Sequence, residues 1–136
     1  MIESYVMFID GDMLSGPVVH MAFMISNRGY RSSWFAREVS RQAWPEVANV
    51  GVGKLGEVHS HKGIEGKTFF ALTCYSRSIR ARRVPNTLKK CIEKIELPKN
   101  ELIAFVLKGF PFLRVREKDA ILDVLEKSKR RFVIFA

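Results

Sequence analysis

Apolar segments alternate with amphipathic segments along most of this chain, and this alternation restricts the possible folds more than any other feature. Short runs of apolar residues indicate buried strands, and apolar residues that recur every three to four positions indicate helices. Strands that alternate with helices predict an α/β fold, with a mostly parallel or mixed sheet and helices on both faces. The expected strands are residues 5–9, 18–25, 55–59, 68–73, 102–107 and 131–135.

Capping residues and prolines set the expected helix boundaries. A serine at position 32 or 33 is a good N-cap for the first helix, and Pro45 ends it. Asn86 is expected to cap the second helix, which Pro98 ends. A third helix is expected over 117–127. With 136 residues, the chain suits a single domain, 1–136.

The apolar runs differ in how deeply we expect them to lie in the sheet. Residues 5–9 and 102–107 are expected at its centre, and 131–135 is expected to be well buried. The third and fourth strands are separated by the glycine-containing segment 62–66, which predicts a hairpin.

The first apolar strand leads into Gly11-Asp12. Ligands bind at the carboxyl ends of strands in open α/β sheets, so Asp12 is a candidate ligand-binding carboxylate. A carboxylate in such a place needs hydrogen-bond donors, which a ligand amine or backbone amides can supply. The alternative is that Asp12 caps a turn, which Gly-Asp pairs often do.

Lysine and arginine are in clear excess. The chain has 23 of them against 14 Asp and Glu, a formal net charge of +9 at pH 7. Such an excess attracts phosphate-rich partners, although a basic surface can also serve solubility alone. The loop 108–115, between a buried strand and a helix, is a natural anion site. The basic residues gather in two groups: Arg77, Arg80, Arg82 and Arg83, and Lys127, Lys129, Arg130 and Arg131.

Other patterns argue against membrane and disulfide-rich classes. No apolar run reaches the length of a membrane span, and residues 1–4 contain no basic secretory leader. Cys74 and Cys91 have neither zinc spacing nor a disulfide framework, so we interpret both as small core residues in a reducing compartment. A cytoplasmic, intracellular location and no resident cofactor are expected.

The pair His59 and His61 is the strongest metal candidate. Two histidines two positions apart on a strand point to one face and can share a zinc ion, but no third ligand is evident nearby. The alternative is that both face solvent at the start of the hairpin. His20 lies within an apolar run and is interpreted as a core histidine. Cys74 is a weak candidate nucleophile, because no histidine lies near it in sequence.

Four short motifs resemble, in their order and spacing, those of the macro domain superfamily. They are Gly11-Asp12, Lys54-Leu55-Gly56-Glu57-Val58, Phe69-Phe70-Ala71-Leu72-Thr73 and the strand from Ile103 to Gly109. The layout from His20 to Gly29, followed by a helix, is most similar to the branch whose human member removes terminal ADP-ribose from glutamate. The chain resembles a degenerate member of this superfamily.

The resemblance implies a three-layer α/β/α domain with a central mixed sheet of about six strands. It also implies that ADP-ribose or a related nucleotide binds in a cleft at the strand ends. Asp12 would accept a hydrogen bond from the adenine amino group, and the loop after Ser26 would lie beside the distal ribose. The resemblance implies these ligand-binding residues: Asp12, Asn27, Arg28, Gly29, Tyr30, Tyr75, Lys108, Gly109 and Phe110. Arg77 is added to them because its basic loop follows a central strand.

Several positions depart from the family pattern. Arg31 stands where the loop before the first helix usually has glycine. In the phosphate loop, Pro111 has no N–H to offer, and Phe112 cannot readily adopt the positive φ that glycine allows. Cys74 and Tyr75 stand where the glutamate-directed branch has a lysine, and 109–113 contains no acidic residue. Efficient ADP-ribosyl hydrolase activity is therefore not expected.

Two other functions remain open from the residues alone. The loop Arg77–Arg83, with Tyr30, Tyr75 and Trp34 for base stacking, can serve RNA or another nucleic acid. The aromatic run Phe110-Pro111-Phe112 can instead contact a protein, in a degenerate interaction domain without a small ligand. The sequence does not set the oligomeric state.

Overall fold

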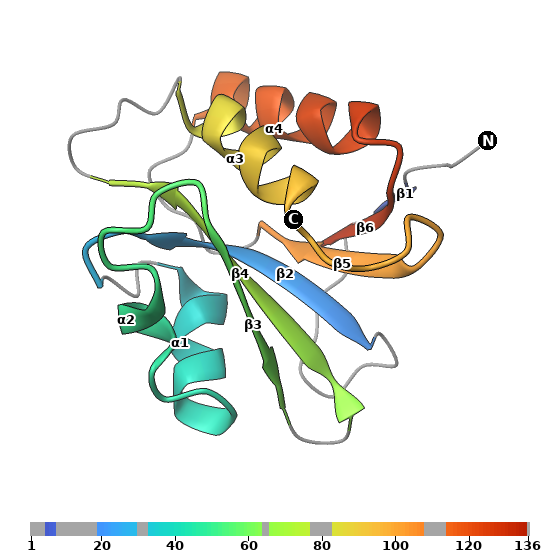
Figure 1. The fold of residues 1–136 in the computed structure, drawn as a ribbon. Coiled ribbons are helices and arrows are strands. Elements are labelled where there is room, and N and C mark those ends of the chain that lie inside the picture. Colours follow the sequence, from blue (N-terminus) through green and yellow to red (C-terminus); the bar gives the residue numbers. More distant parts are fainter. Residues whose placement is uncertain are drawn as a thin grey trace.

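The computed structural model describes residues 5–7, 19–29, 33–63, 66–76, 83–107 and 114–135 (Figure 1). The six strands within these ranges form one sheet with the order β1-β6-β5-β2-β4-β3. Five of them run parallel, and β3 is antiparallel to its neighbour β4. The strands are β1 (Tyr5–Met7), β2 (His20–Ser26), β3 (Val58–Lys62), β4 (Thr68–Tyr75), β5 (Leu102–Val106) and β6 (Arg131–Phe135).

Helices cover both faces of this sheet, as the alternation of segments predicts. The helices α3 and α4 lie on one face, and α1 and α2 lie on the other (Figure 1). The fold is therefore a three-layer α/β/α arrangement around a mixed sheet, and this prediction is confirmed. The helices are α1 (Trp34–Gln42), α2 (Val47–Val50), α3 (Val84–Glu93) and α4 (Val115–Lys127).

The core has two halves, one on each face of the sheet. Successive residues of a strand point to opposite faces. Along β2, Met21, Phe23 and Ile25 therefore pack on the side of α1, and Ala22 and Met24 pack on the side of α3 and α4. Because both faces are covered, the strand reads as an unbroken apolar run rather than an alternating one.

The expected central position of residues 5–9 is wrong. Within the described strands, β1 pairs with β6 alone, so it lies at an edge of the sheet, whereas β5 and β2 are in the middle. An apolar run reports that the faces of a strand are covered. It carries no information about how many strands pair with it, because that pairing uses backbone groups that nearly every residue has.

Several element starts also differ from the expected ones, and those of β3 and α3 have a clear local cause. The strand β3 starts at Val58 rather than at Leu55, because a turn with Gly56 at φ +84° precedes it. The helix α3 starts at Val84 rather than after Asn86, with Pro85 in its first turn, where proline is tolerated. At α1, by contrast, the predicted cap is confirmed, since Ser33 Oγ accepts a hydrogen bond from the Ala36 N–H at 3.1 Å.

Candidate functional site

The carboxyl ends of the five parallel strands lie along one edge of the sheet. The chain leaves β2 at Ser26 and β4 at Tyr75 on this edge, and these two strands are neighbours. Asn27, Arg28 and Gly29 follow β2 directly. The parallel order thus brings together the residues expected beside the distal ribose and the end of β4.

Asn27 is held firmly at this edge by its backbone. Its N–H donates to the Tyr75 carbonyl at 3.0 Å, and its carbonyl accepts from the Gly53 N–H at 3.0 Å. Its side-chain Oδ1 is buried and has no hydrogen-bond partner among the described residues. Because buried acceptors are nearly always satisfied in folded proteins, this oxygen is suited to accept a hydrogen bond from a ligand hydroxyl.

The turn after Asn27 approaches α2 closely. The Arg28 N–H donates to Ser26 Oγ at 3.0 Å, and the Arg28 side chain is exposed. Gly29 has φ +80°, and a Cβ there would lie 3.2 Å from Asn49 Oδ1. A residue other than glycine would therefore strain this turn through its backbone conformation and crowd its neighbour.

A second turn, residues 51–56, lies beside Asn27, and the sequence pattern did not predict it as a turn. Besides the Gly53 contact to Asn27, the Gly56 N–H donates to the Thr73 carbonyl at 2.8 Å. This turn exposes two apolar side chains, Val52 at 51% and Leu55 at 38%. The sequence signal that could have found this turn is its three glycines, at positions 51, 53 and 56.

Tyr75 is less accessible than a cleft wall needs to be. Its exposed fraction is 6%, and it packs in the half of the core under α3. Asp12, Tyr30, Arg77, Lys108, Gly109 and Phe110 lie outside the described residues, so their assigned roles stay predictions. Of the four clustered arginines, only Arg83 is described, exposed at the start of α3.

The interpretation of His59 and His61 as solvent-facing residues is wrong, because both are half-buried. The His61 ring stacks on Trp44 at a centroid distance of 4.9 Å, and its Nε2 lies 3.1 Å from the Ala43 carbonyl. Within the described residues, no three His, Cys, Asp or Glu side chains gather in a way that could hold a metal ion.

His20 lies at the start of β2, away from the candidate site. It is half-buried, with Nε2 3.7 Å from Glu101 Oε2, while its Nδ1 has no hydrogen-bond partner among the described residues. The interpretation as a core histidine is therefore correct only in part.

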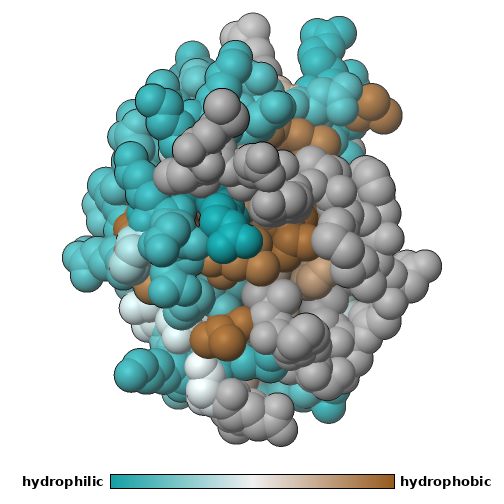
Figure 2. Space-filling model, turned by 90° about the vertical axis from the view of Figure 1, so that its right-hand side faces the viewer, coloured by the Kyte–Doolittle hydropathy of each residue, from teal (hydrophilic) through white to brown (hydrophobic). Residues whose placement is uncertain are grey.

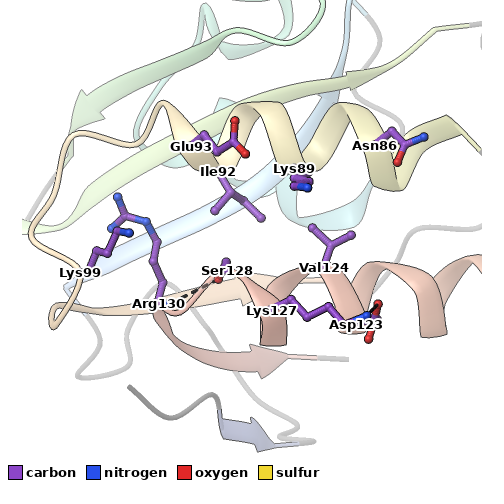
Figure 3. A pocket seen from close by; sticks show the side chains of 10 residues that line it. All are labelled: Asn86, Lys89, Ile92, Glu93, Lys99, Asp123, Val124, Lys127, Ser128 and Arg130. Carbon is purple, nitrogen blue, oxygen red and sulfur yellow. Dashed lines mark hydrogen bonds and ion pairs between the residues drawn. The ribbon is translucent and has the colours of Figure 1, made fainter. Parts of the chain in front are cut away.

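A cavity of about 540 Å³ lies between α3 and α4 (Figure 3). None of the predicted ligand-binding residues that the structure describes lines it. Its floor includes Ile92 and Val124, and Lys127 at its side pairs with Asp123 at 3.0 Å. Two residues of the second basic group of the sequence, Lys127 and Arg130, therefore belong to this groove, together with Lys89 and Lys99.

The surface also has an apolar area on the side that lies to the right in Figure 1. Figure 2 shows hydrophobic side chains at the centre of that face, with hydrophilic residues along one side. Val19, immediately before β2, is 50% exposed.

Among the described helices, none combines the length and apolarity that crossing a membrane requires.

Comparisons with known proteins identify the architecture. No family model and no curated protein matches this sequence. Among solved structures, the macrodomain of Thermus aquaticus DarG matches with a TM-score of 0.64 and 15% identity, over 98% of this chain and 99% of that one. The macrodomain of Mycobacterium tuberculosis DarG matches at 0.65 and 11%, over 97% of each chain. A macrodomain protein from Streptomyces coelicolor matches at 0.64 and 17%, over 98% of this chain and 97% of that one.

Proposed function

We propose that this chain, whose fold is that of the macrodomains, binds ADP-ribose or a related nucleotide at the carboxyl edge of its sheet. The whole chain, residues 1–136, would form the single domain that does so. The observation that carries the proposal is the Asn27 side chain. It combines a rigid backbone position at this edge with a buried Oδ1 that lacks a partner among the described residues.

In this proposal each part of the ligand has its own residues. Asn27 accepts a hydrogen bond from a hydroxyl of the distal ribose, next to the turn that Arg28 and Gly29 form. Asp12 accepts one from the adenine amino group. Lys108, Gly109 and Phe110 contact the diphosphate, and Arg77 adds positive charge. Tyr30 borders the cleft, and the buried Tyr75 contributes the backbone carbonyl that holds Asn27.

Binding should depend on both Asn27 and Asp12. We expect Asn27→Ala and Asp12→Ala each to weaken ADP-ribose binding by about 1–3 kcal/mol, roughly 5- to 150-fold in Kd, because each removes one partner of a desolvated hydrogen bond. Titration calorimetry on the wild type and the two variants measures this. Asn100→Ala and Asp119→Ala, at exposed positions elsewhere, are the matched controls.

Each contrary result identifies a specific error. If the wild type does not bind at millimolar ADP-ribose, the ligand is wrong. If Asp12→Ala binds ADP-ribose as tightly as the wild type does, the assignment of Asp12 to adenine is wrong. If Asn27→Ala does so, the assignment of Asn27 to the distal ribose is wrong. A short RNA titrated at two salt concentrations is the comparison ligand, because nucleic-acid binding weakens steeply with salt.

The protein should not release ADP-ribose efficiently from a glutamate-modified protein. The strand β4 ends in Cys74 and Tyr75 where the glutamate-directed branch has its lysine, and Cys74 is fully buried. A buried thiol with no base beside it is a poor nucleophile. Chromatography of released ADP-ribose checks this, and turnover at the rate of an active hydrolase would contradict it.

A further inference from the structure

Cys74 and Cys91, interpreted from the sequence as small core residues, are in direct contact. Cys74 lies near the end of β4 and Cys91 lies in α3, 17 residues further along the chain. Their sulfur atoms are 3.8 Å apart, and both are free thiols. Neither residue exposes any surface in the resting structure.

The two thiols differ in their surroundings. Cys91 Sγ also lies 3.6 Å from the Thr73 carbonyl and 3.7 Å from the Glu57 carbonyl. The side chain of Glu57 pairs with Lys94 at 3.0 Å, and both of these side chains are about half exposed. Both thiols belong to the buried core cluster on the side of α3, and Cys91 contacts the backbone of a residue whose side chain forms a surface ion pair.

Ionisation favours Cys91 as well. The hydrogen bond that the Cys74 thiol donates lowers the pKa of Cys91, and the ammonium of Lys94 acts in the same direction. Burial raises the pKa of Cys74 well above its usual value. Since the thiolate is the reactive form, Cys91 is the thiol that reacts first.

We propose that Cys74 and Cys91 form a redox modification site, which a peroxide oxidises to an intramolecular disulfide. A disulfide bond is about 2.05 Å long, so sulfurs that are 3.8 Å apart need to approach by about 1.8 Å. The bond would close a loop over residues 74–91, which contains the four clustered arginines. It would also fasten α3 to the end of β4, next to the carbonyl that holds Asn27.

The oxidation balances in two steps. The Cys91 thiolate attacks one oxygen of hydrogen peroxide, the O–O bond breaks, and a sulfenic acid and a hydroxide form. The Cys74 sulfur then attacks the Cys91 sulfur, the S–O bond breaks, and the oxygen leaves as water with the thiol proton. In total, two thiols lose two electrons and two protons, and one peroxide becomes two waters.

The test uses the full chain and hydrogen peroxide. We expect the folded wild type to lose the mass of two hydrogen atoms and both titratable thiols, and peptide mapping without reductant should show Cys74 joined to Cys91. Dithiothreitol should restore both thiols. Cys74→Ser and Cys91→Ser are the controls, and neither should show the hydrogen loss or a cross-linked peptide.

Three results would overturn the proposal. One is wild-type protein that gains oxygen at a single cysteine without cross-linking. The second is a disulfide that joins two molecules instead of residues 74 and 91. The third is a folded protein that keeps both thiols in millimolar peroxide while the urea-unfolded chain is oxidised, because the core would then protect the pair completely. All three are measured on the wild type, so they do not depend on whether a serine variant folds.

Discussion

Replacing Phe105 by alanine should lower the free energy of unfolding by about 3–5 kcal/mol, the usual cost of emptying a buried phenylalanine site. Phe105 is completely buried in β5, a strand with neighbours on both sides. Its ring meets Phe132 of β6 edge-on, with centroids 6.3 Å apart. The truncation therefore removes a large apolar side chain, leaves a cavity under α3 and α4, and deprives Phe132 of its aromatic neighbour.

Urea denaturation followed by circular dichroism measures this loss. Phe105→Leu is the matched control. It should lower the free energy of unfolding by less than half as much, because leucine keeps most of the apolar volume. An alanine variant within about 1 kcal/mol of the wild type would mean that this part of the core collapses to fill the space.

Replacing Arg130 by alanine should lower the free energy of unfolding by about 2–4 kcal/mol, although arginines at protein surfaces usually contribute little to stability. The residue is only 6% exposed. Its guanidinium donates to the Ile95 carbonyl at 2.7 Å and to the Leu97 carbonyl at 3.1 Å. Burial lowers the pKa of this arginine from its usual value, but the group remains charged at neutral pH. Alanine removes the donor to two backbone carbonyls in the segment that follows α3.

The same denaturation experiment, with two further variants, tests this role. Arg130→Lys keeps the charge but not the planar guanidinium. Its free energy of unfolding should therefore lie between that of the wild type and that of the alanine variant. Arg116→Ala, at an exposed position of α4, should change the free energy of unfolding by less than about 0.5 kcal/mol. Equal effects at Arg116 and Arg130 would show that the two carbonyl contacts add nothing.

Local patterns were sufficient for the order of the elements. Apolar runs and period-3.6 apolar patterns are properties of neighbouring residues, and they located each strand and each of the longer helices. The four-residue helix α2 was missed, because Val47-Ala48-Asn49-Val50 is too short to show a period. The start of β3 was misplaced because Leu55 is apolar and yet lies in a turn, 38% exposed.

Contacts between distant segments could not be predicted in the same way. Arg130 reads as one member of a basic surface group, and only the fold shows that it reaches carbonyls 33 and 35 residues away. The contact between Cys74 and Cys91 depends on how α3 lies on β4. In the candidate site, Asn27 followed from the family resemblance, whereas the turn 51–56 beside it came only from the fold.

The antiparallel strand β3 has a consequence for how copies of this protein meet each other. Among the described strands it forms one edge of the sheet, where unpaired backbone groups can template the addition of a foreign strand. Here that edge is five residues long and ends in the exposed Lys62. The stacking of His61 on Trp44 also ties the strand to the segment after α1. A second copy would gain few hydrogen bonds and bring another lysine close, so this edge resists fibrillar self-association.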